Sequence, residues 1–295
     1  GSQYYINNEM LYKTDTETGH RMLVAVPFGN RAIFSEVYNN ETDAYSCILN
    51  IPEETDEIMA YALSCYDYYE PIRMIEAVTD IVIPDRVKVI GDYAFAQQWD
   101  VRVNIPDSVE SIGDFAYYRC SIDGQDIPGS LKFLGECAFS GSDIQTVVIP
   151  EGICGLDEYG GYSCGLSSRA LAGMREAELV VLPTRIRGLP YGLLSGCTNL
   201  KHITIPDSVT EIGSGAFRNS GLIGIDIPEG VEIIGGSAFA ECKALEKANF
   251  EGGTHIIADY AFGNCNSLKT ILLPEGLSGI EQRAFAECME LEKVI

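Results

Sequence analysis

The sequence is poor in basic residues: 20 lysines and arginines face 43 aspartates and glutamates, and the formal net charge is −23. Proteins that bind nucleic acids displace counterions with a basic surface, and anionic membranes attract the same kind of surface. The composition therefore argues against nucleic acid and against an anionic membrane as partners. We interpret the acidity as a means of keeping a long exposed surface soluble, with weak cation binding as the alternative.

Long hydrophobic runs are also missing. No apolar stretch approaches the roughly 20 residues that a membrane-spanning helix needs, so we expect no direct membrane insertion of this segment. No charged-then-apolar signal follows the first residues. If the natural protein is exported, we expect its signal to have been removed from this sequence.

Motifs for catalysis, metals and cofactors are absent as well. The sequence has no H-E-x-x-H, no C-x-x-C pair and no Walker or Rossmann glycine pattern. Its three histidines, His20, His202 and His255, lie far apart in the chain. We therefore predict no metal site, no cofactor and no enzymatic activity.

What the sequence does have is an internal repeat of mostly 22 or 23 residues, marked by an Ile-Pro or Leu-Pro pair. The pairs are Ile51-Pro52, Ile83-Pro84, Ile105-Pro106, Ile127-Pro128, Ile149-Pro150, Leu182-Pro183, Ile205-Pro206, Ile227-Pro228 and Leu273-Pro274. Phe250-Glu251 fills the one missing place in this series. Such self-similarity is typical of a solenoid, in which each repeat buries its apolar residues against its neighbours.

Other positions keep the same frame. An Ile-Gly or Leu-Gly pair follows six residues after most of the prolines, and we expect its glycine to permit a tight turn. A large apolar residue follows eleven residues after the proline, and a cysteine often follows three residues later. We predict a buried structural column of these residues: Phe95, Phe139, Phe217, Phe239, Phe262, Phe285, Cys120, Cys197, Cys242, Cys265 and Cys288.

The repeat predicts an α/β solenoid, a right-handed superhelix with a parallel sheet on its concave side. Short strands would end at each proline, which cannot donate to a ladder. The Ala-Phe segment, as in Ala216-Phe217, predicts a helical or 3₁₀ turn on the convex side. We expect an N-terminal cap over residues 1–22, with strands at Tyr4–Ile6 and Met10–Tyr12. About eleven coils would follow over residues 23–295, with insertions near 67–76 and 157–168.

The series of Ile-Pro, Ile-Gly, Ala-Phe and Cys positions resembles the BspA-like (Treponema pallidum type) leucine-rich-repeat family. The resemblance covers roughly residues 23–295, and the two insertions and Glu251 are its departures. It implies an exported or surface-anchored protein of a host-associated bacterium, and for several members adhesion to host matrix proteins or other bacteria. We therefore expect an extracellular or cell-surface location, with a protein or a carbohydrate at a cell or host surface as partner.

Cys154 and Cys164 fall outside the column and flank the second insertion. The sequence leaves two alternatives open for them, a disulfide bridge across the insertion or two free thiols.

Candidate binding residues are the outward positions of the predicted strands and the tyrosines of the insertions. The row two residues before each proline supplies Asn104, Asp126, Thr204, Asp226 and Asn249, and the neighbouring row supplies Arg102, His202 and Lys247. The insertions supply Tyr68, Tyr69, Tyr159 and Tyr162. Tyrosine is an amphipathic anchor common in binding hot spots. The alternatives are a merely solvated sheet face and tyrosines packed locally over the core. Trp99 stands where the repeat carries leucine, which makes it a candidate for an exposed position.

These features predict a non-enzymatic recognition or adhesion module that binds a protein or glycan through the concave sheet, the insertions or both. The alternative is a structural spacer within a larger cell-surface protein, without a ligand of its own. A fold alone does not decide between them.

Overall fold

The computed structural model describes residues 2–7, 10–25, 34–39, 44–64, 79–99, 101–122, 127–156 and 162–295. The chain forms two compact units, Gly1–Asp143 (unit 1) and Ile144–Ile295 (unit 2). In both units a repeat makes one coil, and most coils contribute a short strand to each of two sheets.

The Ile-Pro pair makes the first corner of a coil. Proline has no N–H and ends the strand, while its carbonyl accepts a hydrogen bond from the valine three residues later. This bond measures 3.1 Å from Val109 N to Pro106 O, and 3.0 Å from Val209 N to Pro206 O. Both valines are fully buried. The pattern I-P-x-x-V therefore fixes a turn and a core residue together.

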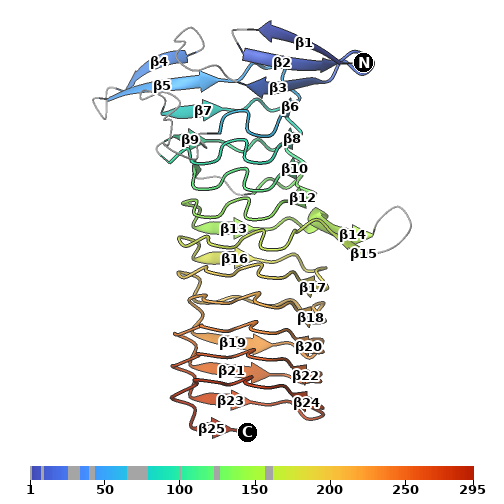
Figure 1. Ribbon diagram of the computed structural model, residues 1–295, viewed down its shortest axis with the longest axis vertical. Helices are drawn as coiled ribbons and strands as arrows, with labels where there is room; N and C mark the ends of the chain where they lie inside the picture. The colour runs from blue at the N-terminus through green and yellow to red at the C-terminus, as the bar shows by residue number, and fades with distance from the viewer. Residues whose placement is uncertain are drawn as a thin grey trace. The chain divides into compact units, whose positions relative to one another are not determined.

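Unit 1 contains two sheets (Figure 1). The first has the order β11-β9-β7-β5-β4. Its strands are β4 (Phe34–Asn39), β5 (Ala44–Asn50), β7 (Asp80–Val82), β9 (Arg102–Val103) and β11 (Ser121–Ile122). The second has the order β1-β2-β3-β6-β8-β10-β12. Its strands are β1 (Ser2–Asn7), β2 (Met10–Asp15), β3 (Arg21–Ala25), β6 (Glu57–Ile58), β8 (Val89–Ile90), β10 (Ser111–Ile112) and β12 (Phe133–Leu134). The strands predicted at Tyr4–Ile6 and Met10–Tyr12 are confirmed as parts of β1 and β2, an antiparallel pair.

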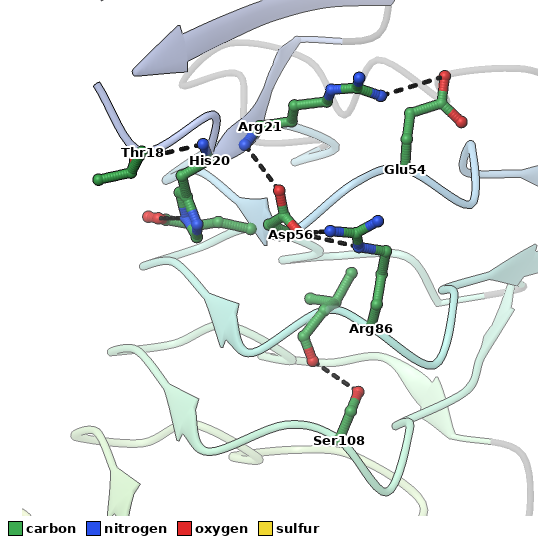
Figure 2. Close-up of polar contacts among 9 residues, drawn as sticks. Thr18, His20, Arg21, Glu54, Asp56, Arg86 and Ser108 are labelled. Carbon is green, nitrogen blue, oxygen red and sulfur yellow. Dashed lines mark hydrogen bonds and ion pairs between the residues drawn. The ribbon is translucent and has the colours of Figure 1, made fainter. Parts of the chain in front are cut away.

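A polar network joins β3 and the turn before it to the following coils (Figure 2). Asp56 accepts hydrogen bonds of 2.8 Å from the backbone N–H of Arg21 and from Nε of Arg86. His20 Nε2 lies 3.0 Å from Glu57 Oε2. Tyr12 of β2 is buried, and its hydroxyl lies 3.1 Å from Oγ1 of Thr55, the residue before Asp56. Burial raises the pKa of Tyr12 to about 12.

Unit 2 also has strands on two sides of its coils, but those of one side form two separate sheets (Figure 1). On one side lie β13 (Thr146–Val148), β16 (Leu179–Val181), β19 (Gly224–Ile227), β21 (Lys247–Phe250), β23 (Thr270–Leu272) and β25 (Lys293–Val294). The other side is the sheet β17 (Gly188–Leu189), β18 (Glu211–Ile212), β20 (Ile233–Ile234), β22 (Ile256–Ile257) and β24 (Gly279–Ile280). A hairpin of β14 (Cys154–Leu156) and β15 (Tyr162–Cys164) projects from the coils of unit 2. Cys154 and Cys164 face each other in it and form a disulfide, which resolves the alternative that the sequence left open.

The core of each unit is a column of stacked rings. In unit 2 the ring centroids lie 5.1 Å apart for Phe217 and Phe239, 5.0 Å for Phe239 and Phe262, and 5.5 Å for Phe262 and Phe285. In unit 1 Phe95, Tyr117 and Phe139 stack in the same way. Every one of these rings is fully buried except Phe285, which is half-buried.

The repeated cysteines hydrogen-bond to the neighbouring coil. Cys242 Sγ donates to Phe217 O at 3.0 Å, and Cys265 Sγ donates to Phe239 O at 3.2 Å. Cys120, Cys197 and Cys288 make the equivalent bond. A thiol suits this place because it is small, apolar and a weak donor. Burial raises the pKa of Cys197 to about 12 and that of Cys242 to about 11.

The glycine after each Ile serves close packing. A Cβ atom on Gly213 would lie 2.4 Å from Leu189 O, and one on Gly235 would lie 2.6 Å from Ser214 N. Neither glycine has a positive φ. A tight turn does begin at this glycine, as the bond from Ala216 N to Gly213 O (3.1 Å) shows, but the close approach of the preceding coil, and not an unusual φ, is what requires glycine there.

The fold is a solenoid of stacked parallel strands with almost no helix. In the described part of the chain the single helix is the 3₁₀ helix η2 (Glu151–Ile153). The helices that the predicted α/β class implies are therefore not found there. The Ala-Phe segments are successive turns. Alternate N–H groups bond to the next coil, as Tyr93 N does to Asp114 O (2.8 Å) and Phe95 N to Ala116 O (2.8 Å). The N–H groups between them close short internal turns, as Ala94 N does to Gly91 O (3.2 Å), so the continuous ladder of a helix does not form. The right-handed superhelix stays a prediction.

Candidate recognition groove on unit 2

The outward rows of unit 2 meet in a hollow, which we call the groove. Five residues that we selected from the sequence line it: His202, Thr204, Asp226, Lys247 and Asn249. Leu179, Val181 and Thr184 line the same hollow, whose volume is about 730 Å³. This volume is within the range of about 300–1,000 Å³ that is usual for ligand sites.

The groove lies where the sheet of unit 2 is interrupted. Strand β16 pairs with β13, and β19 pairs with β21, but the segment 201–206 between them forms no strand. Residues 162–295 are described throughout, and within them no ladder joins this segment to β16 or β19. One backbone bond, from Ile223 N to Lys201 O at 3.1 Å, leads to the next coil.

One side of the groove is apolar. Leu179 and Val181 line it from the outward positions of β16, with exposed fractions of 49% and 43%. Val148 of β13 pairs with Val181 beside the groove and is 40% exposed. They surround the buried Val147 and Val180, so they form a continuous aliphatic shelf. Leu179 and Val181 stand in the same two rows as the selected residues, but sequence reasoning passed over them in favour of polar ones.

The other side of the groove is polar and partly ordered. Asn249 Nδ2 donates to Asp226 Oδ1 at 2.6 Å, which holds the carboxylate on the face of the sheet. His202, Thr204 and Lys247 are exposed beside this pair. The groove therefore places an aliphatic surface next to a fixed carboxylate, an ammonium group and an imidazole.

In unit 1, the side chains selected at the corresponding outward positions contact other residues of the same fold. Arg102 forms an ion pair with Asp80, with 2.7 Å between Nη2 and Oδ1. Asn104 bonds twice to Ile83: Oδ1 accepts from its N–H at 2.7 Å, and Nδ2 donates to its carbonyl at 3.0 Å. These side chains link neighbouring coils, and Asp126 lies outside the described residues.

The selected tyrosines are not brought into this groove. Tyr68, Tyr69 and Tyr159 lie outside the described residues. Tyr162 begins β15, where its backbone pairs with Leu156. Their role as binding anchors stays a prediction.

Two further features bear on function. The described part of the chain contains no group of three or more metal-ligating side chains that could hold a metal ion. In the same residues no helix is both long and apolar enough to cross a membrane.

Comparison with known proteins supports the repeat assignment. The family model described as "BspA type Leucine rich repeat region (6 copies)" matches residues 74–175 and 166–292. Similar solved structures include a leucine-rich repeat protein from Bacteroides ovatus, with 23% identity over 97% of this chain and 81% of that one, and a TM-score of 0.59. Another, from Eubacterium ventriosum, has 20% identity over 100% and 84% of the two chains, and a TM-score of 0.53. None of the curated proteins matches. These likenesses support the fold, and the family match covers more than half of the sequence. The chain belongs to the BspA-type leucine-rich repeat family.

Proposed function

We propose that this protein is a non-enzymatic recognition module, extracellular or attached to a cell surface, that binds a partner protein through the groove of unit 2. The groove is the observation that carries the proposal. It combines an aliphatic shelf with polar groups of both signs, the mixture that orients a ligand in most binding sites.

The lining of the groove favours a protein partner over a glycan. The apolar lining is aliphatic, and no tyrosine, tryptophan or phenylalanine stands among the described lining residues. Leu179 and Val181 suit an apolar side chain of a protein segment. Asp226 and Lys247 suit its N–H groups, its carbonyls or its charged side chains.

A structural spacer remains the competing function. A spacer needs a soluble, stable stack of coils, but it does not need an amphipathic hollow on one of its faces. Membership of the family is compatible with either function, because a fold does not fix what its surface binds.

A binding screen with matched variants separates these functions. The chain is tested against a panel of host extracellular-matrix proteins and a panel of glycans, by surface plasmon resonance. The variant combines Leu179→Ser and Val181→Ser. The control is Leu272→Ser, which changes the position equivalent to Val181 in the coil of β23, outside the groove, where the exposed fraction is 38%.

We expect a matrix protein to bind, the double variant to lose about tenfold or more in affinity, and the control to retain it. The expected tenfold loss of affinity assumes that the partner buries the exposed half of the Leu179 and Val181 side chains. Binding to neither panel would favour the spacer. Unchanged binding by the double variant would place recognition on another surface, and glycan binding lost in the double variant would replace the protein partner by a glycan.

A further inference from the structure

Unit 1 carries a second column of rings, outside its core. Tyr61, Tyr93 and Phe115 come from three successive coils, and their rings stack with centroid distances of 4.9 Å and interplanar angles of 4° and 12°. Tyr118 meets Phe115 edge-on at 5.8 Å. Trp99 is joined to Tyr118 by Arg119, which lies between the two rings. We call Tyr61, Tyr93, Phe115, Tyr118 and Trp99 the aromatic ridge.

The aromatic ridge is accessible. The exposed fractions of Tyr61 and Trp99 are 56% and 55%, whereas the core rings Phe95 and Tyr117 are fully buried. The exposure expected for Trp99 is thereby confirmed. Tyr93, Phe115 and Tyr118 are half-buried, since each ring covers part of its neighbours. The aromatic ridge therefore presents a row of ring edges flanked by two more open rings.

The fold does not require rings at these places. Tyr61, Tyr93 and Phe115 have φ values of 60°, 55° and 54°, a left-handed conformation that bulky residues seldom adopt. Two coils of unit 2 use glycine at the same repeat position, Gly192 (φ 62°) and Gly215 (φ 63°). Three aromatic residues in succession at a position that suits glycine indicate a role other than forming the turn.

The contacts of Arg119 indicate that a guanidinium group packs favourably on these rings. Its guanidinium carbon is 4.8 Å from the centroid of Trp99 and 5.1 Å from that of Tyr118, both within cation–π range. Among the described residues of unit 2 there is one pair of the same kind, with the guanidinium carbon of Arg169 at 5.1 Å from the ring centroid of Tyr191. Cationic side chains thus find favourable positions on the turn side of these coils.

Carboxylates run alongside the stacked rings. Asp92 and Asp114 directly precede Tyr93 and Phe115 in the sequence. Each also accepts a hydrogen bond from the backbone of the next coil: Asp114 N donates to Asp92 at 2.8 Å, and Glu136 N donates to Asp114 at 2.6 Å. These bonds hold the carboxylates in line beside the rings. Negative charge next to aromatic faces and edges is complementary to a cationic partner.

We propose that the aromatic ridge of unit 1 binds an arginine-rich segment of a partner protein, whose guanidinium groups lie on the exposed rings and pair with Asp92 and Asp114. Arginine is favoured over lysine because its planar group stacks on rings while it donates to carboxylates. This site is separate from the groove of unit 2, so an experiment can refute either of the two proposals without refuting the other.

The test uses a fluorescein-labelled decapeptide of alternating arginine and glycine, titrated with the full chain and followed by fluorescence anisotropy in low-salt buffer. The variant combines Tyr61→Gly and Tyr93→Gly, since glycine is what the fold itself uses at this position. The matched control is Tyr260→Gly, at the same repeat position in unit 2 (φ 59°) and outside the aromatic ridge. Circular dichroism verifies folding.

We expect the double variant to bind the peptide at least about fivefold more weakly than the native chain, and the control to bind it equally well. Asp92→Asn supplies a second measurement that changes no residue with a positive φ. Its amide oxygen can still accept the bond from Asp114 N, and we expect it to weaken binding about twofold to threefold. Its control is Asp259→Asn, an exposed aspartate that precedes Tyr260 in unit 2 as Asp92 precedes Tyr93 and lies outside both the aromatic ridge and the groove.

Equal affinity of the native chain and all variants would overturn the proposal, because binding would then reflect diffuse attraction to a chain with net charge −23. A neutral oligosaccharide that binds the native chain and is lost in the double variant would also overturn it, since the aromatic ridge would then be a glycan platform. If the double variant does not fold, the comparison of Asp92→Asn with Asp259→Asn decides.

Discussion

Phe239→Ala is the mutation that most directly tests how the coils of unit 2 are held together. Phe239 is fully buried between the rings of Phe217 and Phe262, at 5.1 and 5.0 Å. Removing a buried phenylalanine costs about 3–5 kcal/mol through lost transfer energy and the cavity that remains. The rigid spacing of coils, fixed by backbone bonds such as Phe239 N to Ala261 O (2.7 Å), limits collapse of that cavity. We therefore expect the upper half of this range.

The assay is native-state hydrogen exchange of the backbone amides, because a stack of coils need not unfold as one unit. A loss of about 4 kcal/mol corresponds to roughly a thousandfold faster exchange of amides that open with this coil. The amides of Phe217 and Phe239, which bond to Ala238 and Ala261 of the following coils, report on the region.

The control for this mutation is Ile256→Ala, at an outward position of β22 with an exposed fraction of 37%. We expect it to change stability by no more than about 0.5 kcal/mol. If Phe239→Ala accelerated exchange less than about fivefold, the stacked rings would not be the main support of the coils, and the account of the core would be refuted.

Two further predictions concern titratable groups. Burial raises the pKa of Cys197 to about 12 and of Cys242 to about 11, so we expect neither thiol to react with a disulfide reagent at pH 8 until the protein is unfolded; rapid labelling of the folded chain at either residue would contradict their burial. The folded pKa of Tyr12, about 12, exceeds its ordinary value of 10, so its neutral form stabilises the folded state fully below pH 10, and that contribution is lost as pH rises toward 12. Thermal melting between pH 9 and 12 should show a shallower decline in Tm for Tyr12→Phe than for the native chain, and parallel declines would exclude this contribution.

The core was predictable because the repeat samples each core position many times. The frame places Phe217 and Phe239 eleven residues after a proline and Phe262 eleven residues after Glu251, which fills the place of a proline. The same frame places the three rings in one stack, so a single chain supplies its own internal comparison. The Ala-Phe segment was expected to form a helical or 3₁₀ turn; it forms turns with bonds such as Ala94 N to Gly91 O but no continuous helix, and the reason is non-local. The N–H groups of Tyr93 and Phe95 bond to the next coil, and no pattern within one repeat reveals that choice.

The two candidate binding surfaces were predictable only in part. The register identified His202, Asp226 and Lys247 as outward residues, but their convergence depends on the interruption at 201–206, whose alternating residues are those of an ordinary strand. The aromatic ridge was missed although a signal existed: aromatic residues stand two positions before the core residue in coils that begin at successive prolines. Each ring alone looked like an ordinary turn residue, and only the stacking across coils distinguishes them.

Hydrogen exchange in the presence of a bound matrix protein tests the central claim, recognition through the groove of unit 2, most directly. The segment 201–206 belongs to no ladder, so its amides should exchange quickly in the free chain, faster than those of β21 and β23. We predict that a bound partner slows the amide exchange of His202, Thr204 and β16, and that the exchange rates of β23 stay unchanged. A partner that binds tightly yet slows exchange at none of these residues would contradict the claim.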